Sequence, residues 1–372
     1  MIQVNHMDPN QEFCPNLACS ARGKVGAGNI RIHSHKEGRY RCLCCGKTFG
    51  ASRGTAAFGI KHDQETFTRV TTLLAYGCPV QAAAIAFELD ERTVAAWLER
   101  SGQHCQQVHE ALIGQAKLDL GQVQADELKV KTQQGTVWMA MAECVKFRLW
   151  LGGIISKERD LSLIRTLVAM VFSLALCRPL LLAADGLVSY VRAFQEAFRS
   201  PFPRTTPGRP KLRPWDNVAI VQVVKQRTQG VLSGQRRIVQ GSTDLVQQLL
   251  KETQGGGQIN TAYIERLNST FRQCLAALTR RGRMLARLPR TLTHSMYLVG
   301  TVYNFCTYHD SLALERLISP QRRRWLRRTP AIAARLTDHR WSVQALLCFK
   351  VPPPTFVPPK RRGRPPKVTA CP

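Results

Sequence analysis

Alternating polar and apolar positions predict three short strands in the middle of the chain. Side chains alternate over 121–130, which indicates a strand with Asp126 on its polar side. Residues 135–143 and 146–155 are also short segments rich in strand-forming residues, with glycine or charged residues between them. Three consecutive strands of this kind favour an antiparallel meander.

A buried parallel strand is predicted after a long amphipathic stretch over 160–177. The apolar run 179–185 stops at Asp185, just before a glycine. Strands covered on both faces are continuously apolar, and the ligand sites of open α/β sheets lie at the carboxyl ends of such strands. Asp185 could equally cap the helix predicted over 187–198. Residues 217–225 provide one further strand.

A predicted helix near residue 270 carries an acid on its polar face. Its apolar side chains follow the spacing of one helical face, and they are Ile264, Leu267, Phe271 and Leu275. Glu265, Asn268 and Arg272 lie on another face. The simplest explanation is a solvated face with a Glu/Arg pair. The two strand-borne aspartates offer Glu265 a second explanation.

Two aspartates on strands and a glutamate on a helix form a carboxylate cluster suited to a divalent cation. Oxygen-only ligands favour Mg²⁺ or Mn²⁺. Two such ions roughly 3.5 to 4 Å apart can activate an attacking oxygen and stabilise the leaving oxygen of a phosphodiester. Without a cation the acids would repel one another. We therefore interpret Asp126, Asp185 and Glu265 as a catalytic, metal-binding triad.

The charge balance of the chain points to a polyanionic partner. Lys and Arg number 53 against 25 Asp and Glu, a formal net charge of +28 over 372 residues. Nucleic acid is the leading partner, and a membrane is a weaker one because the charge is spread over folded regions. The longest apolar run, 166–177, has 12 residues, against the roughly 20 that span a bilayer. With no signal peptide evident, we expect a cytoplasmic protein.

Five cysteines fall within the first 45 residues and predict a zinc ribbon. A C-x₄-C pair and a C-x₂-C pair have the spacing of two knuckles around one tetrahedral Zn²⁺, and the ligands we assign are Cys14, Cys19, Cys42 and Cys45. Cys44 is expected to be a bystander, although it could replace a neighbour. Arg39 and Arg41, among basic and aromatic residues between the knuckles, are candidate DNA phosphate contacts.

A helix-turn-helix pattern follows the zinc ribbon. A helical stretch around 67–74 is followed by short helices over 80–87 and 92–98. Asp90 would cap the third helix, and its exposed Arg92 and Thr93 are candidate base contacts.

Basic residues dominate the carboxyl-terminal part of the chain. Residues 320–372 hold 13 Lys or Arg against one acid, which will bind phosphates in a salt-dependent way. After a proline-rich linker, the segment 360–367 resembles an AT-hook, in which Arg362 and Arg364 would enter a narrow minor groove. A non-specific basic tail is the alternative. Arg280 and Arg281 lie in a further basic segment after Glu265 and fit a DNA-facing surface, though a solvated basic helix would look similar.

The acidic residues also carry a family resemblance. Asp126, Asp185 and Glu265, with Arg272 seven positions beyond the glutamate, resemble the acidic triad of DDE-type insertion-sequence transposases, in particular the IS-one-like group. The Ile-Glu-Arg-x-Asn context of that group is matched at 264–268, and its Asp-Glu pair at 126–127.

The resemblance implies a ribonuclease-H-like catalytic domain that holds two Mg²⁺ ions and performs DNA strand cleavage and strand transfer. It further implies supporting roles for Arg266, Asn268 and Arg272, and a homodimer or larger assembly on double-stranded DNA at the element ends and the target. The expected location is the nucleoid of a prokaryotic cytosol.

The fold class expected is therefore α/β, with small amino-terminal DNA-binding modules and a basic tail. The expected parts are a zinc ribbon over 1–58, an all-α helix-turn-helix domain over 59–112, a catalytic domain over 113–310, a basic helical extension over 311–350, and a linker with the AT-hook-like tail over 351–372. A non-catalytic DNA-binding regulator or architectural protein is the alternative function. A nuclease or recombinase that hydrolyses without strand transfer has the same site.

Overall fold

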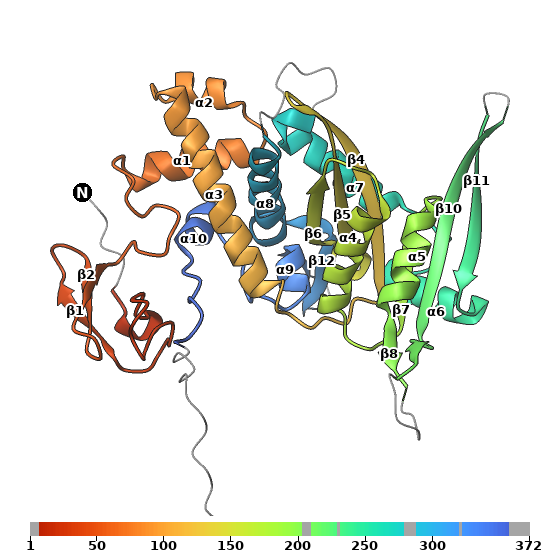
Figure 1. Cartoon of the computed structure of the whole chain (residues 1–372), viewed down its shortest axis with the longest axis horizontal. Helices are drawn as coiled ribbons and strands as arrows, with labels where there is room; N and C mark the ends of the chain where they lie inside the picture. The colour runs from red at the N-terminus through yellow and green to blue at the C-terminus, as the bar shows by residue number, and fades with distance from the viewer. Residues whose placement is uncertain (1–6, 203–209, 229–230, 279–287, 320–321, 357–372) are drawn as a thin grey trace, which may run out of the picture. The chain divides into compact units, whose positions relative to one another are not determined.

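The computed structural model describes residues 7–202, 210–228, 231–278, 288–319 and 322–356. The chain forms two compact units (Figure 1). Met1–Gly59 and Lys350–Pro372 make up the first, and Ile60–Phe349 make up the second. The helix-turn-helix and catalytic regions expected from the sequence therefore belong to one compact unit.

The first unit is built around a small antiparallel sheet. Its strands are β1 (Ile30–Ser34), β2 (Arg39–Cys42) and β3 (Thr48–Gly50), paired in that order, after a short helix η1 (Pro9–Gln11). Tyr40 and Phe49 pack with buried cysteines in its core. Lys350 forms an ion pair with Glu12, which ties the start of the carboxyl-terminal segment to this unit.

Three helices open the second unit: α1 (Gln64–Ala75), α2 (Val80–Ala86) and α3 (Glu91–Leu112). As expected, the side chain of Asp90 caps α3 by accepting from the backbone N–H of Arg92. The predicted third helix, 92–98, was too short. Helix α3 continues beyond residue 98 because its later residues pack against α8 (Pro289–Cys306). The packing is tight, since a Cβ added to Gly102 would lie 2.3 Å from the carbonyl oxygen of His294.

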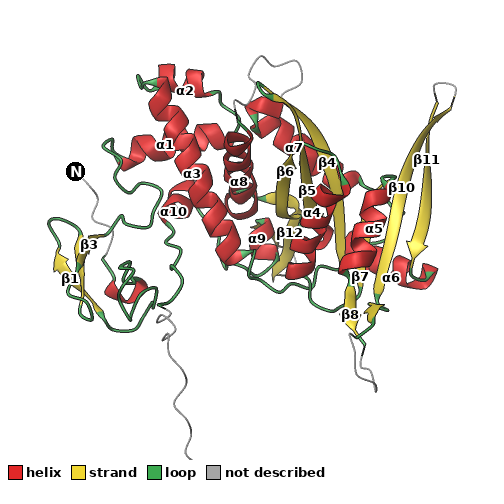
Figure 2. Ribbon diagram, in the orientation of Figure 1, coloured by secondary structure: helices red, strands yellow, loops and turns green. Residues whose placement is uncertain are grey.

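A six-stranded mixed sheet forms the centre of this unit (Figure 2). Its order is β11-β10-β7-β4-β5-β6, and the bounds are β4 (Gln122–Thr132), β5 (Gly135–Cys144), β6 (Leu149–Ser156), β7 (Leu180–Asp185), β10 (Val218–Thr228) and β11 (Val231–Gln240). The antiparallel meander β4-β5-β6 and the parallel β7 are confirmed. The predicted strand near 217–225 is β10, parallel to β7, with β11 antiparallel beside it.

Helices cover both faces of the sheet. Successive side chains of a strand point to opposite faces, and two neighbouring residues of β4 contact different helices. Glu127 contacts Tyr190 of α5, whereas its neighbour Asp126 contacts Asn268 of α7. The helices are α4 (Leu161–Leu174), α5 (Val188–Ala197), α6 (Thr243–Gln254) and α7 (Ala262–Cys274), with a short helix η2 (Val145–Phe147) before β6 and another, η3 (Ala276–Leu278), after α7. The fold is thus mixed α/β, with a six-stranded sheet flanked by helices. A separate short pair, β8 (Arg199–Pro201) and β9 (Leu212–Pro214), follows α5.

The segment 311–350 is not the helical extension expected. It begins with an antiparallel ribbon of β12 (His309–Ser319) and β13 (Arg322–Arg328), and only then come α9 (Pro330–Ala333) and α10 (Val343–Cys348). A helix through 322–328 would stack like charges at i, i+4, which destabilises it, whereas a strand sends neighbouring arginines to alternate faces. Among the described residues, no helix is both long and apolar enough to cross a membrane.

Candidate metal centre and its surroundings

The parallel pairing of β4 with β7 brings two of the predicted acids together. Gln124 is paired with Ala183, so Asp126 and Asp185, two residues farther along each strand, lie at the same level. Carboxylate oxygens of Asp126, Glu127 and Asp185 all lie within 4.8 Å of one another. The structure therefore forms an Asp-Glu-Asp group that could hold a divalent metal ion.

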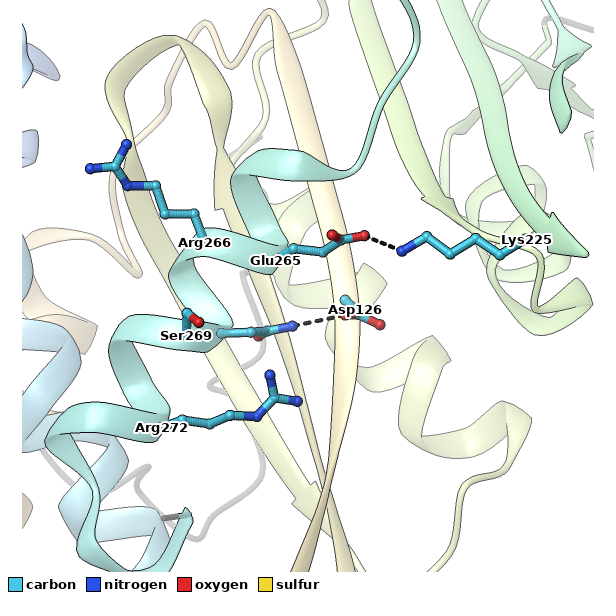
Figure 3. Close-up of a pocket in the computed structure, with 7 residues that line it drawn as sticks. Asp126, Lys225, Glu265, Arg266, Ser269 and Arg272 are labelled. Carbon is cyan, nitrogen blue, oxygen red and sulfur yellow. Dashed lines mark hydrogen bonds and ion pairs between the residues drawn. The ribbon is translucent and has the colours of Figure 1, made fainter. Parts of the chain in front are cut away.

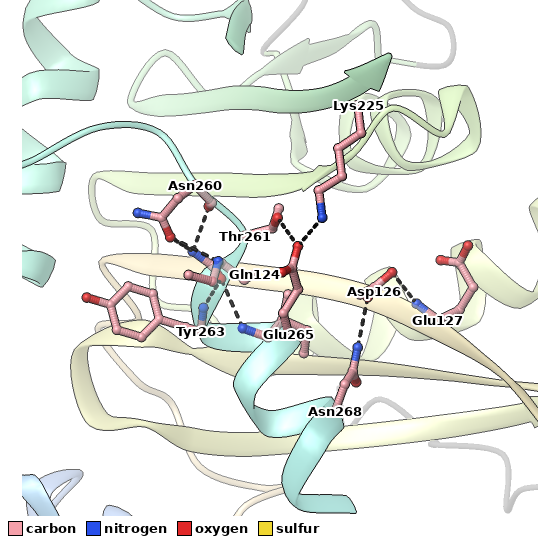
Figure 4. Close-up of polar contacts among 11 residues, drawn as sticks. Gln124, Asp126, Glu127, Lys225, Asn260, Thr261, Tyr263, Glu265 and Asn268 are labelled. Carbon is pink, nitrogen blue, oxygen red and sulfur yellow. Dashed lines mark hydrogen bonds and ion pairs between the residues drawn. The ribbon is translucent and has the colours of Figure 1, made fainter. Parts of the chain in front are cut away.

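Glu265 lies beside this group but is not one of the three clustered acids. It stands in the first turn of α7, where its Oε1 accepts hydrogen bonds from Lys225 Nζ at 2.5 Å and from Thr261 Oγ1 at 2.9 Å (Figure 4). Burial alone would raise the pKa of Glu265, but these hydrogen bonds and the ammonium charge hold the pKa below its usual value. The third predicted acid is thus ionised and paired with a cation.

Asp126 and Glu265 line one cavity of about 560 Å³ (Figure 3). The other residues that line it are Lys225, Arg266, Asn268, Ser269 and Arg272. Arg266, Asn268 and Arg272, the α7 residues predicted to support the triad, therefore line the same cavity as Asp126 and Glu265. In Figure 3 the carboxylate of Glu265 points toward Lys225 and lies beside Asp126, whereas Arg266 extends away from both.

Asn268 ties α7 to the metal-binding group. Its Nδ2 donates to Asp126 Oδ2 at 2.8 Å, while Asp126 Oδ1 accepts from the backbone N–H of Glu127 at 2.9 Å. Asn268 is buried, and among the described residues its Oδ1 has no hydrogen-bond partner. Both oxygens of Asp126 are thus oriented by neutral donors.

The electrostatics of Asp126 favour a bound cation. Burial raises its pKa, the negative charges of Glu127, Asp185 and Glu265 add to this, and the pKa reaches about 6. A divalent ion would remove the repulsion that raises this pKa. The oxygen-only donor set suits Mg²⁺ or Mn²⁺.

Glu127 is the site residue that spacing alone did not single out. Its side chain is 1% exposed, Tyr190 donates to its Oε2 at 2.9 Å, and Arg159 Nε donates to its Oε1 at 2.5 Å. The same guanidinium lies 3.7 Å from Asp185 Oδ2. The only sequence signal for Glu127 was the Asp-Glu pair of the family resemblance, and nothing local pointed to Arg159 or Tyr190.

Gln124 fixes the start of α7 against β4. Its Oε1 accepts from the backbone N–H groups of Tyr263 and Ile264, both at 3.0 Å, and its Nε2 donates to the carbonyl of Asn260 at 2.8 Å. The residue before α7, Thr261, makes no side-chain cap. A fully buried side chain from the sheet therefore satisfies backbone donors that a helix leaves unpaired, two residues before Asp126.

Asp185 does not cap α5, the alternative role considered from the sequence, because the residue before this helix is Leu187 and, among the described residues, no side chain caps it. The Oδ1 of Asp185 accepts from the backbone N–H of Leu187 at 2.9 Å. Gln222 Nε2 donates to the carbonyl of Asp185 at 2.8 Å. One carboxylate oxygen of Asp185 thus shapes the turn, and the other faces Arg159.

Four cysteines of the first unit form a second candidate metal site. The Sγ atoms of Cys14, Cys19, Cys42 and Cys45 all lie within 4.8 Å of one another. Cys44 is exposed and outside this group. Burial raises the pKa of Cys45, but the backbone N–H of Lys47 and the side chain of Asn16, among other donors, lower it to about 7. Four thiols at this separation could bind zinc.

The predicted DNA contacts are placed in part. Arg41 is exposed on β2, but the half-buried Arg39 donates to Thr48 Oγ1 at 2.7 Å. In the first turn of α3, Arg92 is exposed and Thr93 is half-buried. The remaining candidates lie outside the described residues, and they are Arg280, Arg281, Arg362 and Arg364.

Comparison of the chain with protein-family models and with curated proteins gives no match.

Proposed function

We propose that the protein is a DNA transposase of the DDE type, which cleaves DNA strands and joins a DNA 3′-hydroxyl to a target phosphodiester. The observation that carries this is the Asp126, Glu127 and Asp185 carboxylate group, with Glu265 lining the cavity that Asp126 also lines. The net charge of +28 supports DNA as the substrate. The ribonuclease-H-like fold implied by the family resemblance is compatible with a meander followed by two parallel strands.

The acidic residues would hold the metal, and their neighbours would position them. Asp126 and Asp185 are the first ligands, with Glu127 or Glu265 completing the set. Bound Mg²⁺ or Mn²⁺ supplies electrostatic activation of the attacking oxygen and stabilisation of the leaving oxygen. Asn268 keeps Asp126 oriented. Ligands to a metal are commonly oriented by such outer contacts.

Cations near the cavity have two roles in this proposal. Arg266 and Arg272 line the cavity and would contact the DNA backbone. Lys225 donates a hydrogen bond to Glu265. When metal and DNA bind, Glu265 would leave Lys225 to bind the metal, and Lys225 would contact a phosphate instead. In the first unit, Cys14, Cys19, Cys42 and Cys45 would hold a structural Zn²⁺ and so fix β1 to β3, on which Arg41 is exposed to DNA.

The experiment compares the native chain with Glu265→Gln, which removes a charge with little change of shape. The substrates are the DNA segments that flank its own coding frame, where the ends of an element would lie, with Mg²⁺ or Mn²⁺ present. We expect cleavage and joining by the native chain, and loss of both at unchanged DNA binding in the variant. Equal DNA binding without cleavage by either protein would refute the proposal.

A non-catalytic DNA-binding regulator is the second candidate. It is favoured by the Glu265–Lys225 pair, in which the acid already has a cation partner, and by the strong positive charge. A nuclease that only hydrolyses DNA can be distinguished from a transposase by supplying DNA with a free 3′-hydroxyl, because only a transposase joins this hydroxyl to a second duplex.

A further inference from the structure

The β12–β13 ribbon carries like charges directly opposite each other. Its register pairs Arg316 with Arg324, and both side chains are exposed. Like charges at such positions destabilise a two-stranded pair. Within the described part of the chain, neither guanidinium has a carboxylate partner. An unbalanced pair of this kind is stabilised when a polyanion lies across it.

The ribbon also exposes an aromatic side chain on its other face. Trp325 is 61% exposed and stands opposite Glu315, and on the same face Arg327 has a side chain that is 59% exposed. Exposed aromatic rings beside guanidiniums are typical of surfaces that contact nucleic acid, where they pack on sugars or bases. Two-stranded ribbons fit the grooves of duplex DNA.

Basic side chains surround the start of the ribbon, and one of them also lines the cavity of the metal centre. Burial and the charges of Arg266 and Arg148 lower the pKa of His309, the first residue of β12, to about 4. Two further cations lie beside Tyr308, the residue before β12. Its ring centre lies 4.8 Å from the guanidinium of Arg327. Arg340 lies 5.1 Å from the same ring. Arg266, which lines the cavity, is thus close enough to the start of β12 for its charge to affect His309.

We propose that the β12–β13 ribbon is a DNA-binding surface, on which Arg316 and Arg324 contact phosphates of a duplex that also reaches the metal centre. The choice of DNA as the polyanion rests on the proposed function. Leu314 and Leu326, which are paired with each other on the arginine face, are also exposed. Self-association through them is the competing use of this face.

The test is the salt dependence of DNA binding by the full chain. A fluorescently labelled 30-base-pair duplex is titrated from 0.05 to 0.3 M salt without added Mg²⁺ or Mn²⁺ and without a chelator, so that metal-dependent cleavage does not enter the measurement and the cysteine cluster keeps its zinc. For the double variant Arg316→Gln and Arg324→Gln, we expect the negative slope of log K against log salt to become less negative by about 1.8, because each lost phosphate contact removes about 0.9 from its magnitude. Affinity at 0.1 M salt should fall at least tenfold. The variant Arg316→Lys with Arg324→Lys keeps both charges and should keep the slope.

The matched control removes two cations elsewhere, at Arg178 before β7 and Lys251 on α6. Both are exposed. The helix α6 packs against β7 inside the sheet, whereas α9 contacts both the ribbon and the edge strand β6. We expect its slope to match that of the native chain.

Three results would overturn the inference. The first is an unchanged slope in the Arg316 and Arg324 double variant. The second is an equal loss in the control, and the third is a change of oligomeric state by sedimentation without a change of slope. Normal DNA binding with no cleavage would instead refute only the proposed catalysis, whereas no DNA binding by the native chain would refute both.

Discussion

At the scale of single residues, hydrogen bonds around Asp126 control the metal centre. Asn268 is the one side chain of α7 that the structure shows bonded to this acid. Because the amide is buried, its loss would leave Asp126 with its charge less well balanced and a small cavity beside it.

Replacing Asn268 by Ala should lower the rate of metal-dependent DNA cleavage roughly 10- to 100-fold, as is usual for residues that orient metal ligands. It should also cost about 1 to 3 kcal/mol of unfolding free energy in urea, because a buried hydrogen bond is lost. An exposed amide of the same helix, outside the cavity, offers a control, since Gln273→Ala should change neither quantity by much. A cleavage rate equal to that of the native chain would show that Asn268 does not position Asp126.

Because of Glu143, the stability of the protein should fall as the pH rises. Burial raises its pKa from 4.5 to about 8, although Arg148 and Arg266 lower it, and among the described residues its Oε2 has no hydrogen-bond partner. The folded state thus binds a proton that the unfolded state releases above pH 4.5, so this group's contribution becomes less favourable by roughly 1.4 kcal/mol per pH unit up to about 8.

Substitution of Glu143 by Gln removes this titration. The native chain should therefore lose unfolding free energy relative to the variant between pH 5 and 8, by a few kcal/mol in all. Urea unfolding at several pH values measures the difference. Two parallel stability curves would mean that Glu143 is already ionised in the folded protein.

At the scale of elements, the small sheet of the first unit depends on its cysteines. It has few apolar residues, and small units of this kind generally need a metal or disulfides for stability. Cys19 Sγ lies 3.8 Å from Cys42 Sγ, and Cys14 Sγ lies 3.7 Å from Cys45 Sγ.

Zinc removal should unfold β1 to β3 while the six-stranded sheet remains. We expect one zinc ion per native chain by elemental analysis, none for Cys42→Ser, and one for Cys44→Ser, whose thiol lies outside the cluster. Limited proteolysis should cut residues 7–59 in Cys42→Ser and in the chelated native chain. A zinc content that Cys42→Ser leaves unchanged would contradict the assigned ligands.

At the scale of the whole molecule, α3 and α8 join the amino-terminal helices to the sheet within the second unit. The contact is close at Gly102, where a Cβ would meet the backbone of His294, and at Gly300, where it would meet the ring of Trp150. The side chain of Asn304 bonds both backbone groups of Trp150. The helices and the sheet should therefore unfold together.

The variant Gly102→Ala should lower the unfolding free energy by about 1 to 3 kcal/mol or more, because the backbone of α8 must move. The transition should remain a single one by circular dichroism and by tryptophan fluorescence. Gly234→Ala is the control, since no atom lies within 4 Å of its added Cβ. Two separate transitions would show that α1 to α3 fold independently of the sheet.

The sequence by itself determined the elements whose signals are local. Alternation gave the meander, an unbroken apolar run gave β7 ending at Asp185, and helical spacing gave α7 with Glu265 on its polar face. Spacing also marked the four clustered cysteines. These predictions succeed because burial on one or both faces leaves a periodic pattern within a few residues.

Only the tertiary structure decided which side chains meet. Glu127 joins the acidic group and Glu265 pairs with Lys225 because strands and helices far apart in the chain bring them together. The length of α3 was set by its packing on α8, and the β12–β13 ribbon replaced an expected helix. Such contacts leave no periodic trace in the sequence, because they depend on the three-dimensional positions of elements rather than on the residues next to them.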